Sequence, residues 1–68
     1  MEYLVILEKS ETSFGAYVPD LPGCVAAGET KEETMQLIRE AIELHIESLR
    51  DNGEDVPEPH SLAERVAV

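Results

Sequence analysis

The chain has 68 residues, which is enough for one small domain and leaves no room for a second hydrophobic core. Its 43% hydrophobic and 29% charged residues are typical of a folded protein and exclude a disordered acidic tail. Fifteen Asp and Glu against five Lys and Arg give a formal net charge of −10, which disfavours direct binding to nucleic acid because phosphates repel it. A basic partner protein, or simple solubility, accounts better for this charge.

The sequence also limits where the protein works. Its longest apolar run, residues 4–7, is far shorter than the roughly 20 residues that span a bilayer, and the start lacks the basic region of a signal peptide. We therefore predict a cytoplasmic protein with no membrane partner. The single cysteine, Cys24, excludes an internal disulfide and a cysteine-rich zinc site.

The first half of the chain predicts three short strands. Residues 1–7 are rich in Leu, Ile and Val and precede a polar break at residues 8–13, a pattern typical of a strand and a turn. Residues 15–18 predict a second strand, which Phe14 can begin and which ends at Pro19 because proline has no donor for a sheet ladder. Residues 24–28 predict a third strand. Between the last two lies a rigid turn with two fixed φ angles and a permissive glycine, formed by Pro19, Asp20, Leu21, Pro22, Gly23 and Cys24.

Thr30 begins the clearest element, an amphipathic helix that ends near Asn52. Apolar side chains recur at steps of three and four between residues 35 and 49, and Gly53 suits a C-terminal stop. Thr30 at the N-cap and Glu33 three residues later match a capping box, in which the two side chains satisfy backbone donors reciprocally.

The end of the chain is acidic and interrupted by prolines at residues 54–61, and residues 62–68 alternate weakly, as a short fourth strand or a frayed end would. We therefore predict a single α+β domain over residues 1–68: a three-stranded antiparallel sheet with one long helix packed on it, followed by either the short fourth strand or the frayed end. Because Leu4, Ile6, Ala16 and Val18 do not alternate cleanly with polar residues, we expect a second copy to cover one sheet face in a homo-oligomer, a dimer or a tetramer.

Residues that could carry chemistry do not form a recognisable site. His45 lies on the apolar helix stripe and His60 in the proline-rich segment, without metal-ligand spacing. Cys24 has no cation or histidine near it in the sequence to lower its pKa. No phosphate-cradling glycine motif is present. We predict no cofactor, no metal and no enzymatic activity.

Carboxylates are numerous enough for a magnesium-dependent nuclease to be considered. Asp20 lies in the rigid turn, whereas Asp51 and Asp55 lie near the helix end, and most other acids have the spacing of a solvated helix face. This spacing favours a solvated surface over a metal site.

The run from Tyr17 to Cys24, together with Ala27-Gly28-Glu29-Thr30, Glu32-Glu33 and Glu40-Ala41-Ile42, resembles the HicB family of type II antitoxins. Asn52-Gly53 and Val56-Pro57-Glu58-Pro59 also match that family's helix end and acidic loop. The resemblance implies a partial RNase H-like fold and binding to a small, basic HicA-type mRNA-cleaving toxin. It does not transfer nuclease activity, because function depends on the site and not on the fold.

Under this resemblance the acidic surface would speed encounter with a basic toxin. Many family members add a C-terminal DNA-binding domain, and we expect this chain to act as the N-terminal type of domain without one. The candidate partner-binding residues are the turn residue Asp20 and the exposed helical acids Glu40, Glu43 and Glu47. The alternative is an orphan oligomeric binding module with no cognate toxin.

Overall fold

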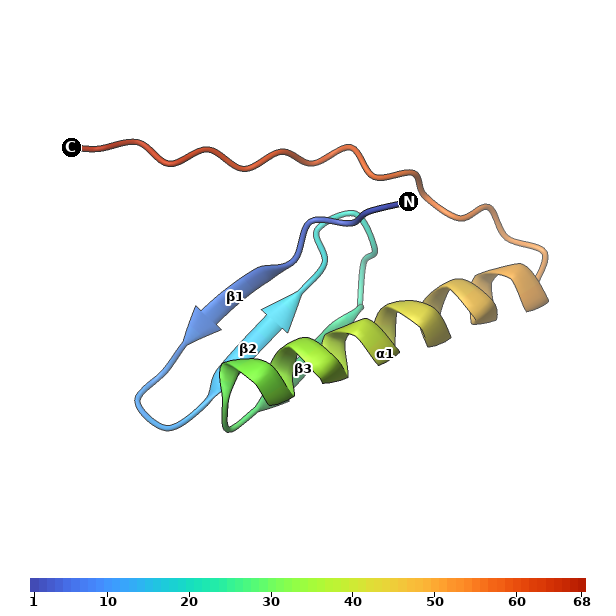
Figure 1. Ribbon diagram of the computed structural model, residues 1–68. Helices are drawn as coiled ribbons and strands as arrows, with labels where there is room; N and C mark the ends of the chain where they lie inside the picture. The colour runs from blue at the N-terminus through green and yellow to red at the C-terminus, as the bar shows by residue number, and fades with distance from the viewer.

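The computed structural model in Figure 1 describes all 68 residues and contains three strands, one helix and a long extended end. The strands β1 (Ile6–Lys9), β2 (Phe14–Tyr17) and β3 (Val25–Gly28) form an antiparallel sheet in the order β1-β2-β3. The helix α1 (Lys31–Asp51) lies across one face of this sheet. The predicted α+β architecture of a three-stranded sheet and a long helix is confirmed.

The strand register divides the side chains between two unlike faces. Ala16 lies on the helix side, where it is 5% exposed, because alternate side chains of a strand point to opposite faces. Tyr17 lies opposite Ile6 in β1 and opposite Val25 in β3, on the face that the helix does not cover. Tyr17 and Val25 are 40% and 64% exposed, so this open face carries an apolar row.

The first strand begins and ends later than predicted. Residues 1–5 are outside the ladder, whereas Glu8 and Lys9, which we assigned to the turn, pair with β2. The turn is shorter because two serines close it: the Ser10 N–H donates to the Ser13 carbonyl at 2.9 Å, and the Ser13 N–H donates to Ser10 Oγ at 3.2 Å.

The hydrophobic core is small and lies between the helix and the second and third strands. Its buried members are Ala16, Val18, Leu21, Cys24 and Ile38. Only seven of the 68 residues are buried, as expected for a chain with so much surface for its volume. The helix packs against β3 and β2 and leaves the β1 side of the sheet uncovered.

The helix begins at a well-formed cap. Thr30 Oγ1 accepts a hydrogen bond from the Glu33 N–H at 3.0 Å, and the Thr34 hydroxyl donates to the Thr30 carbonyl at 2.8 Å. The reciprocal contact of Glu33 reaches the N–H of Glu29 at 3.4 Å, one residue earlier than a capping box requires. At the other end Gly53 has φ +69°, the left-handed conformation that terminates helices. The chain has no helix that combines the length and the apolar character needed to cross a membrane.

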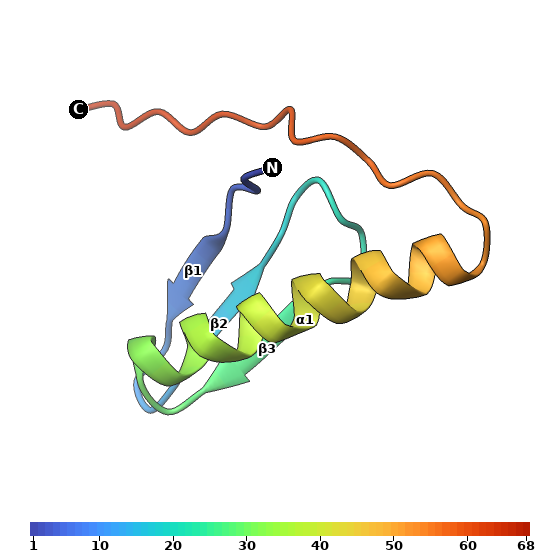
Figure 2. The ribbon, with the colours of Figure 1, turned by 45° about the vertical axis from the view of Figure 1, so that its right-hand side comes forward.

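The C-terminal segment, residues 54–68, forms no regular element. Of the alternatives that we left open for its end, the fourth strand is therefore absent. Figures 1 and 2 both show the segment leaving the end of α1, passing the N-terminus and running clear of β1. A strand needs a partner at ladder distance, and here the segment has none. Leu62 and Val66 are accordingly 93% and 80% exposed.

Candidate functional site

The rigid turn between β2 and β3 folds back on itself and closes the core. The Val18 N–H donates to the Cys24 carbonyl at 3.2 Å, the Leu21 N–H to Val18 at 3.1 Å and the Cys24 N–H to Leu21 at 3.0 Å. Gly23 supplies the one left-handed residue, with φ +84°. The Leu21 side chain is completely buried in the core, so the turn positions its neighbour Asp20 at a fixed point.

Asp20 binds the C-terminal segment of its own chain. Its Oδ2 accepts hydrogen bonds from the N–H groups of His60 at 2.9 Å and Ser61 at 3.0 Å, and its Oδ1 accepts one from the Ser61 hydroxyl at 2.5 Å. His60 Nε2 lies 3.1 Å from Oδ1. The hydrogen bonds from Ser61, first its hydroxyl and then its N–H, lower the pKa of Asp20 to about 2, with smaller help from His60 and against the effect of burial.

Asp20 is buried and bonded within its own chain. The residue is only 3% exposed, and its carboxylate oxygens accept bonds from His60 and Ser61. The structure therefore places Asp20 inside the chain, apart from the helical acids with which we had grouped it as a partner-binding residue.

The helical acids lie together on the surface. Glu40, Glu43 and Glu47 are all exposed, and their spacing of three and four residues places them in one stripe along α1. The only ion pair in the protein joins His60 to Asp20, so no Lys or Arg neutralises these three carboxylates at contact distance. They form an acidic stripe that is free to meet a cationic surface.

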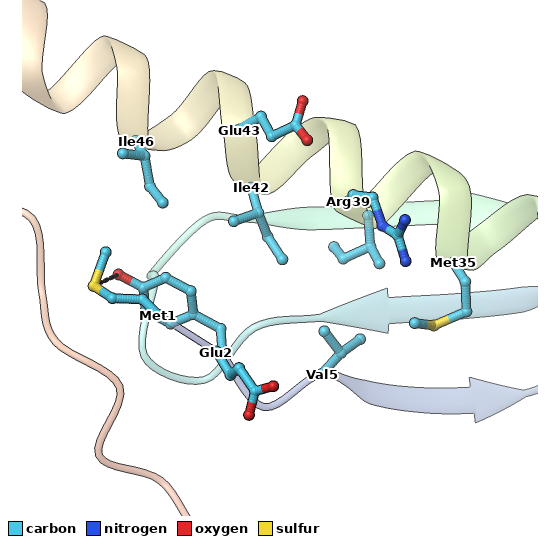
Figure 3. A pocket seen from close by; sticks show the side chains of 10 residues that line it. Met1, Glu2, Val5, Met35, Arg39, Ile42, Glu43 and Ile46 are labelled. Carbon is cyan, nitrogen blue, oxygen red and sulfur yellow. Dashed lines mark hydrogen bonds between the residues drawn. The ribbon is translucent and has the colours of Figure 1, made fainter.

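An apolar groove runs beside this stripe and was not predicted from the sequence. It has a volume of about 650 Å³ and lies between α1 and the N-terminal residues of the chain, as Figure 3 shows. Seven of its ten lining residues are hydrophobic, among them Tyr3, Val5, Met35, Ile42 and Ile46. Glu43 stands at its rim and points away from it (Figure 3).

The groove results from the position of the helix on the sheet. Of the apolar helix positions, the core buries Ile38 and leaves Ile42 and Ile46 only half-buried. The signal in the sequence was the width of the apolar stripe, since a three-stranded sheet of four-residue strands cannot cover so many side chains.

The other side chains considered for chemistry are separated from one another. Cys24 is 3% exposed, and burial raises the pKa of its thiol. His45 is half-buried on α1. No three His, Cys, Asp or Glu side chains lie close enough together to hold a metal ion.

Residues 3–68 match the family described as HicB-like antitoxin of bacterial toxin-antitoxin systems. The chain belongs to this family. The solved N-terminal domain of the Burkholderia pseudomallei antitoxin HicB is 38% identical, with a TM-score of 0.82 over 91% of this chain and 74% of that one. The fold of this HicB-like chain is thus the fold of an antitoxin's N-terminal domain.

A second solved structure is a toxin-antitoxin complex of HicA3 and HicB3. It aligns with a TM-score of 0.74 at 33% identity over 87% of this chain and 70% of the solved one.

The relatives of this HicB-like chain differ in length. A UPF0150 protein of Thermoplasma acidophilum is 42% identical, and the match covers all of this chain and 97% of the relative. An uncharacterised 14.9 kDa protein of Haemophilus phage HP1 is 35% identical over 97% of this chain, which spans only half of that protein's length.

Proposed function

We propose that this HicB-like chain is an antitoxin that binds and neutralises a small, basic HicA-type mRNA-cleaving toxin by protein–protein contact. The observation that carries the proposal is the likeness to the HicA3 and HicB3 complex at 33% identity over 87% of the chain. Membership of the antitoxin family over residues 3–68 supports the same role.

The acidic stripe is the surface that we propose for the toxin. Glu40, Glu43 and Glu47 present three carboxylates without a cationic neighbour in contact, and the chain as a whole carries a net charge of −10. Such a field accelerates encounter with a basic protein and repels RNA, which competes for the same basic surface of the toxin. Neutralisation then requires no chemistry by the antitoxin, because occupying the toxin's RNA-binding face is sufficient.

Co-expression tests this function directly. The product of the neighbouring gene is induced alone and together with this chain, and growth and copurification are measured. We expect growth arrest from the toxin alone, rescue by the antitoxin and recovery of both chains as one complex. A neighbouring product that is neither toxic nor retained by the antitoxin would refute the proposal and favour an orphan binding module.

Charge reversal tests the proposed surface. Glu43→Lys together with Glu47→Lys should weaken toxin binding and slow association most strongly at low salt, because the stripe acts over the Debye length. The matched control is Glu8→Lys with Glu11→Lys, the same charge change at two exposed positions at the β1–β2 end of the sheet. Equal losses of toxin affinity in the two double variants would mean that toxin binding depends on net charge and not on the acidic stripe.

A further inference from the structure

The C-terminal segment is held at its base and free beyond it. The Tyr3 hydroxyl donates to the Pro57 carbonyl, and Asp20 binds His60 and Ser61. The tail, defined here as residues 62–68, makes no hydrogen bond to any part of the chain. Ser61 is therefore the last residue of the segment that hydrogen bonds hold to the rest of the chain.

The tail has the side-chain pattern of a strand with one apolar face. In an extended chain the even positions Leu62, Glu64, Val66 and Val68 share one face, and three of these four are apolar. Leu62, Val66 and Val68 are at least 80% exposed. The chain has a radius of gyration of 13.2 Å, against about 11 Å expected for a compact domain of its length, which reflects this projection into solvent.

A complementary site is open at the first strand. β1 pairs only with β2, so its outer edge presents unpaired backbone donors and acceptors that can template another strand. The apolar groove begins next to this edge at Val5, the residue before β1, and lies between α1 and the N-terminal residues. A strand that pairs with this edge and continues past Val5 would bring its side chains to the groove, which Met35 and Ile42 line from α1.

One basic residue of the groove is complementary to one acidic residue of the tail, although Glu2 and Glu43 also line the groove. Arg39 is exposed on the groove wall and has no carboxylate in contact with it. Glu64 is the one polar residue on the apolar face of the tail, and its charge is opposite to that of Arg39.

We propose that the tail of one copy forms the fourth strand on the β1 edge of a second copy, and that the exchange is reciprocal. The tail does not pair with the edge of its own chain, since it runs clear of β1 in both views (Figures 1 and 2). The reciprocal exchange fills both grooves and completes two cores that each bury only seven residues. This inference is independent of the toxin.

Light scattering after size exclusion tests the assembly. The full chain should have twice its 7.5 kDa mass at micromolar concentration, and Leu62→Asp with Val66→Asp should halve that mass. The matched control is Ala63→Asp with Ala67→Asp, which adds the same charge to the opposite face of the tail and should leave the dimer intact. These positions lie outside the core, so the helical circular dichroism should not change. A full-length monomer, or equal masses for the two double variants, would overturn the proposal.

A disulfide distinguishes exchange from closure within one chain. In the double variant Arg39→Cys with Glu64→Cys, oxidation should give a covalent dimer on a non-reducing gel, well above the background of each single variant. The native Cys24 is buried and does not interfere. A monomer with an internal disulfide would show that the tail pairs with its own β1 edge, which would refute exchange between copies.

Discussion

The Asp20 carboxylate accepts hydrogen bonds from both the N–H and the hydroxyl of Ser61, 41 residues further along the chain. One oxygen receives the N–H and the other the hydroxyl, so the contact fixes the direction of the C-terminal segment as well as its position. Asp20 itself sits on a turn that the buried Leu21 ties to the core. A residue of the β2–β3 turn therefore sets where the C-terminal segment lies as far as Ser61.

Asp20→Asn should release the C-terminal segment while the sheet and helix remain folded. Asparagine keeps one acceptor oxygen and replaces the other with an amide that cannot accept the N–H donors of His60 and Ser61. Amide hydrogen exchange should lose its protection at these two residues and keep it in α1. Asp55→Asn, at an exposed position in the same segment, is the control. It should leave amide protection unchanged both at His60 and Ser61 and in α1. Unchanged protection at Ser61 in Asp20→Asn would contradict this role.

The same contact should depend on pH in a defined window. The pKa of Asp20 is about 2 with the segment bound, below the value of about 3.9 for a free aspartate. A lowered pKa means that the stabilisation is complete above about pH 4 and is lost as the pH falls towards 2. The Ser61 amide resonance, followed by NMR, should report release of the segment across that window.

Ser61→Ala should move this transition to higher pH. The Ser61 hydroxyl is the largest cause of the lowered pKa of Asp20, so its removal raises that pKa towards the ordinary value. The His60 amide resonance provides the readout, since its N–H still donates to Asp20. An unchanged transition would show that the hydroxyl bond is not formed in solution.

Gly28→Ala should destabilise the junction between β3 and α1. A Cβ at this position would lie 2.7 Å from Thr34 Oγ1 and 3.1 Å from the Thr34 backbone nitrogen. Thr34 is fully buried and its hydroxyl donates to the Thr30 carbonyl, so it cannot move aside without losing that bond. Overpacking of this kind costs about 1–3 kcal/mol of the free energy of unfolding, measurable by urea titration.

Gly15→Ala is the matched control for that substitution. A Cβ there meets no atom within 4 Å, and Gly15 has no positive φ. Its free energy of unfolding should stay within about 0.5 kcal/mol of the parent. Equal losses at the two glycines would indicate a general effect of glycine replacement instead of the close approach to Thr34.

The sequence predicted elements where a local rule decides the structure. The cap at Thr30, the stop at Gly53 and the end of the second strand before Pro19 depend on one or two side chains and their backbone chemistry. The start of β1 was misplaced because apolar residues 1–5 satisfy strand propensity, whereas the ladder extends only as far as its partner strand does.

The features that sequence reasoning missed are contacts between distant segments. The residues near Asp20 in the sequence do not indicate a hydrogen bond to Ser61. The predicted turn gave no partner for the Asp20 carboxylate. The groove depends on where α1 lies on the sheet. The wide apolar stripe of the helix indicated that some of its side chains stay uncovered, but it did not indicate which ones. The exposed acids Glu43 and Glu47 were found because charge at helical spacing is a local pattern.

Leu21→Ala should show that the turn is part of the core. Leu21 is completely buried, and deleting such a side chain costs about 2–5 kcal/mol through lost burial and the cavity left behind. The free energy of unfolding of a small domain is only a few kcal/mol. The variant should therefore unfold at a much lower urea concentration than the parent. Leu21→Val removes less volume and keeps the measurement possible if the alanine variant does not fold.

Leu44→Ala removes the same side chain from α1 at a position that is 66% exposed. Its free energy of unfolding should change by no more than about 0.5 kcal/mol, since little burial is lost and alanine favours helix. All variants must be compared at one protein concentration, because association between copies would add to the apparent stability. If Leu21→Ala were as stable as Leu44→Ala, the turn would be a surface connection, and the position of Asp20 would not depend on the core.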